Sequence, residues 1–253
     1  SKQNITLTAY SYEWLLATKD LQIPLKLHIK IDSGMGRIGF TEVTELQQAL
    51  AFISKRDWLQ ITGVFTHFAT ADEEEQTLFR KQVSRFEQLL NVFEQRPAMV
   101  HTSNSAAALL YPDQHWNAVR FGISMYGIAP SSWVNGELPF PLEKALSLHT
   151  EVAHVKKVTK GSTIGYGATY VAPTNEWIAT IPIGYADGLL RKLHNQSVLI
   201  KGKKMPIVGK ICMDQCMIRL DEKIEVGEKV TLLGLQENEE ILIEEWAEAL
   251  ETI

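Results

Sequence analysis

The first half of the chain alternates between two kinds of hydrophobic pattern. Short apolar and β-branched runs predict strands at Asn4–Ala9, Leu25–Asp32, Ile61–Phe68, Met99–Ser103 and Val119–Ile123. Between these runs, apolar residues recur at helical spacing, which predicts helices over Tyr12–Lys19, Thr44–Lys55, Thr77–Gln95 and Ala106–Leu110. Strands that alternate with helices predict a parallel sheet.

Polar residues gather where these predicted strands end. They are Lys30, Asp32 and Arg37 after the second strand, Thr66 and His67 after the third, and His101, Asn104 and Ser105 after the fourth. In (β/α)₈ barrels of the TIM type, the active site lies at the carboxyl ends of the strands. We therefore expect part of a (β/α)₈ barrel, although a flavodoxin-like open sheet also fits the pattern.

The sequence Ser103-Asn104-Ser105 opens a helix of small residues. Free amides, hydroxyl groups and the helix dipole suit such a turn to an anion, although an ordinary helix cap fits the same residues. Barrels often hold a phosphate with the loops after their last two strands. Asn104–Ser105 and Gly122–Ile123 occupy those places here, so a phosphate-bearing cofactor fits.

The number of predicted strands is smaller than a closed barrel needs. About five strand units precede the change of pattern, whereas a (β/α)₈ barrel has eight. If the phosphate site marks the last two strands of the barrel, the missing strand units precede residue 1. We therefore expect a chain that is truncated at its amino terminus.

From about Phe140 the pattern becomes all-β. Short, often alternating runs separated by glycine or charged turns predict strands, and a helix follows them. The strands are expected within Ala145–Lys157, Trp177–Pro182, Ser197–Ile200, Pro206–Val208, Cys216–Leu220 and Lys229–Leu233, and the helix over Glu240–Thr252. We expect two domains, an incomplete barrel over residues 1–140 and a β-rich domain over residues 141–253.

Composition narrows the classes of function. The 253 residues carry a net charge of −5, which argues against a nucleic-acid-binding protein. No uncharged run is long enough to span a membrane, and the first residues lack the apolar core of a signal peptide. Two cysteines, Cys212 and Cys216, are too few for a zinc cage or a disulfide framework, so we expect small buried residues of a cytoplasmic protein without a metal.

Three motifs in the second half carry a family resemblance. They are Gly165-Tyr166-Gly167-Ala168-Thr169-Tyr170, Pro182-Ile183-Gly184-Tyr185-Ala186-Asp187-Gly188 and Gly209-Lys210-Ile211-Cys212-Met213-Asp214-Gln215. A tyrosine between two glycines suits a phenol presented to a reaction centre, and equally an ordinary tight turn. Together the motifs resemble the carboxy-terminal domain of alanine racemases, which are fold-type III pyridoxal-phosphate enzymes.

The resemblance implies a cofactor and two acid–base groups. In this family pyridoxal 5'-phosphate forms a Schiff base with a lysine near the first barrel strand, and the cofactor ring stabilises a carbanion at the substrate Cα. Racemisation needs a proton acceptor on one face of that carbon and a donor on the other. The lysine serves one face, and Tyr166 matches the tyrosine that serves the other.

Other family roles carry over residue by residue. Arg120 matches the arginine at the pyridine nitrogen, His67 the histidine under the cofactor ring, and His101 the histidine that supports the arginine. Arg37 matches the residue that meets the substrate carboxylate, and Lys30 a lysine that some members carry as a carbamate, although an ion pair with a neighbouring acid is the ordinary interpretation. Asn104, Ser105, Gly122 and Ile123 match the family residues that contact the phosphate. Met213 and Asp214 match residues near the substrate, and Tyr185 matches a residue at the entrance to the active site.

The family assembles as a homodimer, and on that pattern Tyr166, Tyr185, Met213 and Asp214 serve the partner's barrel. The chain also departs from the pattern: no segment like Lys-Ala-Asn-Ala-Tyr-Gly-His-Gly, which holds the cofactor lysine, occurs in it. It also stops before a family segment with a phosphate-binding tyrosine. We expect a chain that is inactive alone, from a bacterial enzyme that interconverts L- and D-alanine for peptidoglycan.

Three alternatives remain open at this point. A serine or broad-specificity racemase can share all of these motifs. A non-catalytic pyridoxal-phosphate carrier is a second alternative, but such proteins lack the β-rich domain. A non-catalytic interaction fragment is the third.

Overall fold

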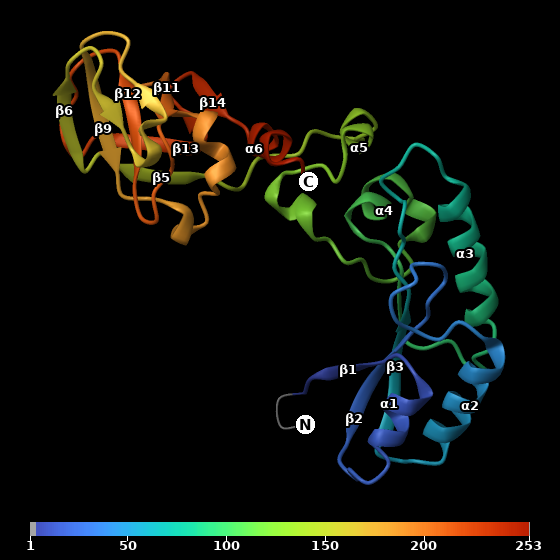
Figure 1. The fold of residues 1–253 in the computed structure, drawn as a ribbon. Helices are drawn as coiled ribbons and strands as arrows, with labels where there is room; N and C mark the ends of the chain where they lie inside the picture. The colour runs from blue at the N-terminus through green and yellow to red at the C-terminus, as the bar shows by residue number, and fades with distance from the viewer. Residues whose placement is uncertain (1–3, 253) are drawn as a thin grey trace. The chain divides into compact units, whose positions relative to one another are not determined.

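The computed structural model describes residues 4–252. The chain divides into two compact units, one up to Glu143 and one from Lys144, called here the N-terminal unit and the C-terminal unit. Figure 1 shows the two units as a helix-covered sheet and a β-rich body.

The sheet of the N-terminal unit consists of β1 (Thr6–Ala9), β2 (Leu25–Lys30), β3 (Leu59–Phe65) and β4 (Met99–His101). These strands lie side by side in chain order, and every pair is parallel. A flavodoxin-like sheet reverses its strand order at a switch point, whereas a barrel wall does not. The observed order confirms part of a (β/α)₈ barrel.

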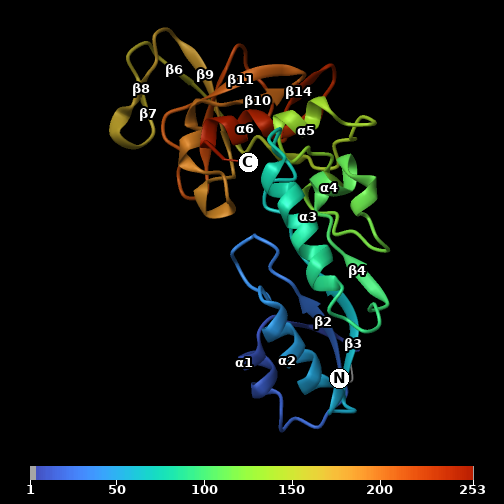
Figure 2. The same ribbon diagram turned by 90° about the vertical axis from the view of Figure 1, so that its right-hand side faces the viewer.

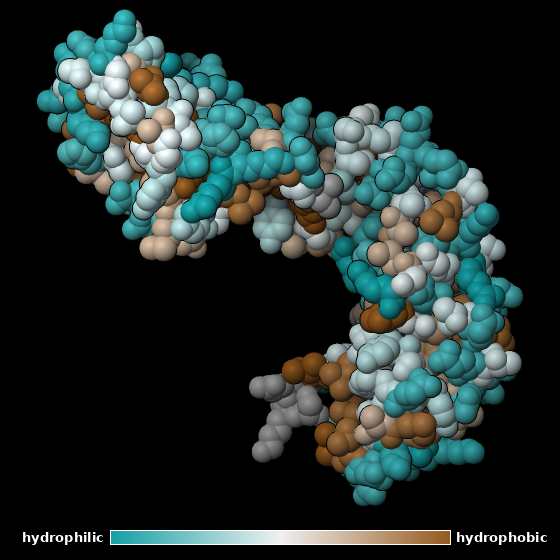
Figure 3. Space-filling model, viewed as in Figure 1, coloured by the Kyte–Doolittle hydropathy of each residue, from teal (hydrophilic) through white to brown (hydrophobic). Residues whose placement is uncertain are grey.

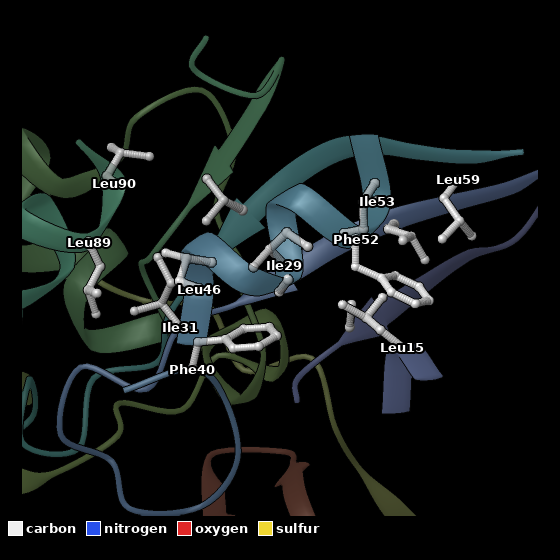
Figure 4. Packing of buried hydrophobic residues seen from close by; sticks show 14 of the residues in the cluster. Leu15, Ile29, Ile31, Phe40, Leu46, Phe52, Ile53, Leu59, Leu89 and Leu90 are labelled. Carbon is white, nitrogen blue, oxygen red and sulfur yellow. The ribbon is translucent and has the colours of Figure 1, made fainter. Parts of the chain in front are cut away.

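Helices α1 (Tyr12–Ala17), α2 (Val43–Ser54) and α3 (Thr77–Leu90) follow the first three strands. They lie on one face of the sheet (Figures 1 and 2). Figure 4 shows how Leu15 of α1 and Phe52 of α2 meet the strand residue Ile29 in one buried cluster. The predicted helix over Thr77–Gln95 is too long, because the chain leaves helical geometry after Leu90, although Phe93 still packs on this core.

The predicted strand Val119–Ile123 is wrong. Here the parallel ladder contains only one isolated bridge, between His101 and Ala118, and one further hydrogen bond, from the Arg120 amide to the Ser103 carbonyl at 2.9 Å. The chain then turns at Gly122 into the 3₁₀ helix η2 (Ile123–Tyr126). The remaining short helices of this unit are α4 (Ser105–Leu110), η1 (Pro112–Gln114) and α5 (Ser132–Gly136).

The C-terminal unit is built on an eight-stranded antiparallel sheet. Its order is β14-β13-β10-β11-β12-β9-β6, and β5 pairs with β13. The strands are β5 (Leu148–Glu151), β6 (His154–Val158), β9 (Glu176–Ile181), β10 (Ser197–Ile200), β11 (Lys203–Val208), β12 (Cys216–Leu220), β13 (Lys229–Gln236) and β14 (Glu239–Ile241). A separate hairpin joins β7 (Thr163–Ile164) to β8 (Tyr170–Val171). The helical segments are η3 (Tyr166–Ala168), η4 (Tyr185–Asp187), η5 (Arg191–Asn195) and α6 (Ile243–Leu250).

Two predictions for this unit need correction. The run Ala145–Lys157 is two strands, because β5 pairs with β13 while β6 pairs with β9. The predicted helix Glu240–Thr252 begins as β14, and α6 starts only at Ile243, where the Glu245 carboxylate accepts a hydrogen bond from the Leu242 amide. The turn before β14 has Glu237 at φ 56°, a left-handed conformation that reverses the chain into a hairpin.

Cys216 is buried as predicted, whereas Cys212 is only half-buried. Across residues 4–252, no helix has the length and apolar character needed to cross a bilayer. Within the same range, no three His, Cys, Asp or Glu side chains are grouped so that they could hold a metal ion. Figure 3 shows apolar surface near the edge strand β1, where Ile5 and Leu7 are exposed.

Candidate active site

Arg120 is the centre of the polar network in the N-terminal unit. Its Nη1 donates to His101 Nδ1 at 2.7 Å and to the His101 carbonyl at 2.9 Å. Its Nη2 lies 2.7 Å from the Thr66 carbonyl, 3.1 Å from that of Thr102 and 3.2 Å from His67 Nδ1. These contacts fix the guanidinium at the carboxyl ends of β3 and β4.

The remaining N–H of this guanidinium is not used by the protein. No acceptor for Arg120 Nε lies within residues 4–252, although both Nη groups are fully engaged. Burial, and then the charge of Arg37, lower the pKa of Arg120 to about 10, so the group stays protonated at neutral pH. The arrangement presents one fixed, charged donor to a ligand.

Both histidines beside Arg120 are neutral. Burial is the main cause that lowers the pKa of His67 to about 4, with the charges of Arg120, Arg37 and Lys30 adding to it. Burial, Arg120 and His28 likewise lower the pKa of His101 to about 4. The Phe65 ring stacks on His101 with centroids 4.6 Å apart, which keeps that imidazole flat against β3.

Lys30 ends β2 and is almost fully buried, with 2% of its surface exposed. Its Nζ donates to the Ile31 carbonyl at 2.8 Å and lies 5.6 Å from the centre of the Phe65 ring. No carboxylate within residues 4–252 forms an ion pair with it. Burial therefore lowers its pKa to about 8; the charge of Asp32 raises it, while those of Arg37 and Arg120 lower it further.

The acid nearest in sequence, Asp32, is occupied by backbone amides. Its Oδ1 accepts from Gly34, Met35 and Gly36 at 2.8–3.1 Å, and its Oδ2 accepts from Arg37 at 3.0 Å. Burial raises the pKa of Asp32, but these hydrogen bonds lower it more, so the net shift is downward. The carboxylate shapes the loop that presents the exposed Arg37 side chain.

Gln82 of α3 supports the segment that carries a candidate site residue, and the sequence did not reveal it. It is fully buried; its Oε1 accepts from the Ala69 amide at 2.8 Å, and its Nε2 donates to the His67 carbonyl at 3.1 Å. It therefore holds the segment that carries His67. A polar residue on the apolar side of a helix, three positions after Phe79 and four before Phe86, is a signal that could have identified it.

The predicted phosphate residues lie together at the start of α4. Asn104 caps the helix, since its Oδ1 accepts from the Ala107 amide at 3.0 Å. Ser105 Oγ accepts from the Gly122 amide at 2.9 Å, which joins this turn to Gly122 and the adjoining Ile123. The cap interpretation is thus confirmed for Asn104, and the four residues form one corner of the N-terminal unit.

In the C-terminal unit the three motifs converge on one segment, Gly209–Gln215. The amides of Tyr185 and Ala186 donate to the carbonyls of Cys212 and Met213 at 3.0 and 2.9 Å. A Cβ at Gly184 would lie 2.4 Å from the Cys212 carbonyl oxygen, so only glycine permits this approach. The exposed side chains of Tyr185, Met213 and Asp214 therefore belong to one cluster.

Tyr166 lies at the tip of the β7–β8 hairpin and is 68% exposed. The hairpin packs on the same segment, since a Cβ at Gly209 would lie 2.8 Å from the Ile164 carbonyl oxygen. At its base, Tyr170 donates to the buried Glu176 carboxylate at 2.7 Å. Tyr166 is thus an exposed phenol on an anchored arm.

Two family models match this sequence. The model described as "Alanine racemase, N-terminal domain" matches residues 1–130, and the model described as "Alanine racemase, C-terminal domain" matches residues 145–253. Among curated proteins, the alanine racemase of Geobacillus stearothermophilus is 49% identical over the whole chain. The chain spans 66% of that relative's length.

Solved structures show the same likeness. The alanine racemase of Bacillus anthracis with bound L-Ala-P matches all of this chain and 67% of its own, at 48% identity and a TM-score of 0.94. A histidine racemase from Leuconostoc mesenteroides matches 99% of this chain and 69% of its own, at 33% identity and a TM-score of 0.93. On its fold, its sequence and the arrangement of its motifs, this chain belongs to the alanine racemase family.

Proposed function

We propose that this chain takes part in racemisation of alanine that depends on pyridoxal 5'-phosphate. The observation that carries the proposal is the guanidinium of Arg120, fixed through both Nη groups while its Nε–H has no acceptor in the described protein. An aromatic nitrogen with a free lone pair, such as that of a pyridine ring, is the kind of acceptor this donor needs.

The surrounding residues fit the rest of the cofactor. The neutral ring of His67 offers a flat surface beside Arg120. Asn104, Ser105, Gly122 and Ile123 offer the helix-start corner to the phosphate. When bound, the cofactor supplies an electron sink that makes the substrate Cα–H acidic.

Arg120 then acts by donating without giving up its proton. At a pKa of about 10 it remains a cation at neutral pH, so its Nε–H would hold the ring nitrogen of the cofactor without protonating it. An unprotonated nitrogen would accept less negative charge, which would favour return of the proton to Cα over side reactions.

We assign to Tyr166 the transfer of the proton on one face of the substrate Cα. A phenol is a weak base at neutral pH, so it needs a cationic neighbour in the assembled site to act as one. The lysine that the family resemblance implies is assigned the other face. Two groups on opposite faces are what inversion at Cα requires.

We assign to Arg37 the binding of the substrate carboxylate, because its planar guanidinium can donate two parallel hydrogen bonds to a carboxylate. Lys30, which has no carboxylate partner among residues 4–252 and a pKa of about 8, has a neutral fraction whose Nζ can attack CO₂. The product is a carbamate and one released proton, and the new anion would pair with Arg37 or Arg120. We assign Lys30 this modification.

Two copies are proposed to share their sites, with Tyr166, Tyr185, Met213 and Asp214 of one copy serving the barrel of the other. The exposure of all four side chains in the C-terminal unit supports this assignment. The activity would supply D-alanine for peptidoglycan in the cytoplasm.

A second substrate class is supported by the histidine racemase that shares this fold at 33% identity. The test is deuterium incorporation at Cα, by the natural-length protein with pyridoxal phosphate, for alanine, serine, lysine and histidine. We expect alanine to exchange fastest, and Tyr166→Phe to abolish exchange from one enantiomer while cofactor binding persists. Faster exchange of serine or histidine would change the substrate; bound cofactor with no exchange at all would make the protein a non-catalytic carrier.

A further inference from the structure

A second histidine stands behind the one that contacts Arg120. His28 Nδ1 lies 2.9 Å from His101 Nε2, and the two ring centroids are 5.1 Å apart. Among residues 4–252 this is the one hydrogen bond of the His28 side chain. His28 is absent from the family roles assigned above, and its ring is half-buried beside Phe65.

The direction of this chain of hydrogen bonds is fixed from one end. Arg120 Nη1 can only donate, so His101 Nδ1 at 2.7 Å must be unprotonated. A neutral His101 therefore carries its proton on Nε2 and donates it to His28 Nδ1. Burial lowers the pKa of His28, which favours its neutral ring, and the contact with the Nε2–H of His101 requires the unprotonated nitrogen of that ring to be Nδ1.

The alternative tautomer of His101 would point an N–H at the guanidinium and leave two donors facing each other. What selects against it is an acceptor for the Nε2–H on the far side of the ring, and His28 Nδ1 is that acceptor. Without it, the Nε2–H would lose its partner in a buried site, and both tautomers would be penalised.

The position of the His28 ring depends on Gly63 of the neighbouring strand. A Cβ at Gly63 would lie 2.5 Å from His28 Nε2 and 2.6 Å from Cδ2, so the imidazole rests directly on the glycine backbone. The register of β2 and β3 shifts between Leu27 and His28, which pair with Ile61 and Gly63. The extra residue, Thr62, donates its hydroxyl to the Leu27 carbonyl at 3.3 Å.

We propose that His28 is a positioning residue for Arg120, acting through His101, and that Gly63 is glycine in order to admit the His28 ring. His28 supplies the acceptor that holds His101 in its Nε2–H tautomer. His101 Nδ1 then keeps Nη1 of Arg120 in place, so that Nε–H points to the ligand. The proposal rests on the proposed function only for the identity of that ligand.

The experiment compares His28→Asn with His28→Leu in the whole chain. Asn places Oδ1 where the histidine has Nδ1 and so retains an acceptor; Leu has nearly the same shape without one. Long-range ¹H–¹⁵N correlation spectra of the imidazole groups report which nitrogen of His101 carries the proton. Lys26→Leu, an exposed change on the same strand, serves as the control.

We expect a single Nε2–H tautomer in the wild type, in His28→Asn and in the control. His28→Leu should show a mixture of tautomers and faster exchange of the Arg120 Nη protons. If His28→Leu fails to fold, His28→Ala combined with Gly63→Ala gives a second protein without the acceptor, because the new methyl group occupies space that the ring vacates. Retention of the pure Nε2–H tautomer in either protein would overturn the proposal.

In the natural-length protein, His28→Leu should lower kcat/KM for alanine about tenfold, and His28→Asn less than about threefold. Equal losses in the two variants would also contradict the positioning role. If the wild type racemises no amino acid, the proposed function fails, while the tautomer spectra still decide whether His28 positions Arg120.

Discussion

At the scale of single residues, Lys30 shows how a buried ammonium group can lack a carboxylate partner in the part of the chain that the structure describes. The carboxylate closest in sequence is saturated by four backbone amides, so it cannot approach Nζ as an ion-pair partner. Within the described residues, the ammonium contacts one carbonyl and lies near an aromatic ring. The folded chain therefore favours the neutral amine more than the unfolded chain does.

This predicts a pH dependence of stability. Between about pH 8, the pKa in the folded chain, and 10.5, the ordinary value, the unfolded chain holds a proton that the folded chain has released. Lys30 thus makes the free energy of unfolding rise with pH in this window. Lys30→Met should remove that rise and increase stability at pH 7, as measured by guanidinium chloride unfolding in CO₂-free buffer.

Lys26→Met is the matched control, since Lys26 is exposed on the same strand. The same two variants test the modification, because a carbamate signal from ¹³C-labelled bicarbonate should disappear in Lys30→Met alone. A pH dependence of stability that Lys30→Met leaves intact would show that another group titrates.

At the scale of elements, the loop after β2 is held by a single side chain. The two carboxylate oxygens of Asp32 accept hydrogen bonds from four backbone amides, and Asp32→Asn keeps only one of these oxygens and removes the negative charge. We expect a loss of about 2 kcal/mol in stability and faster amide exchange at Gly34, Met35 and Gly36. Unchanged exchange at these amides would exclude the carboxylate as the organiser of the loop; Asp113→Asn, an exposed change, is the control.

The arm that carries Tyr166 depends on a close approach at Gly209. Gly209 and Gly161 both have positive φ, 72° and 86°, but a Cβ would meet the Ile164 carbonyl oxygen at 2.8 Å only at Gly209. Gly209→Ala should therefore cost at least about 1 kcal/mol more than Gly161→Ala, which carries the backbone strain alone. Chemical unfolding of the two variants measures the difference, and equal costs would mean that the arm does not rest on this segment.

The sequence predicted most elements because their patterns are local. The apolar residues of α2 repeat at helical spacing, and β10 and β12 have the predicted bounds. The failures depend on pairing that no local pattern contains. The segment Val119–Ile123 has the composition of a strand, but β4 is only three residues long and gives it a single bridge. The run Ala145–Lys157 looks continuous, but its halves pair with different strands.

In the candidate site, too, some residues could be predicted from the sequence and others could not. The sequence itself points to Arg120, because a charge stands among apolar residues, whereas the predictions for His67 and His101 rest mainly on the family resemblance. Gln82 acts through the backbone around His67, and His28 acts through the His101 side chain, so their importance depends on contacts between residues that are 15 and 73 positions apart in the sequence. Their roles therefore become visible only when the strands and α3 are placed side by side.

At the scale of the whole molecule, the two units have separate hydrophobic cores. Leu27 is buried in the core of the N-terminal unit and Ile218 in that of the C-terminal unit. Each truncation to alanine should cost about 2–5 kcal/mol, and only within its own unit. Hydrogen exchange resolved by residue would show Leu27→Ala raising exchange in β1–β4, and Ile218→Ala raising it in β9–β13.

A loss of protection in both units from either variant would instead mean that the cores unfold together. Val119→Ala, an exposed apolar truncation in the N-terminal unit, should change neither pattern.

The contact between His28 and Gly63 also limits how this sequence can diverge. No side chain fits at position 63 while the His28 imidazole packs against the Gly63 backbone. Conversely, the imidazole cannot take this position once residue 63 has a side chain. Substitutions at the two positions therefore have a required order: a smaller residue must replace His28 before a larger residue can replace Gly63. In a collection of descendants, the pair should drift together or remain fixed together, although the two residues lie 35 positions apart in the chain.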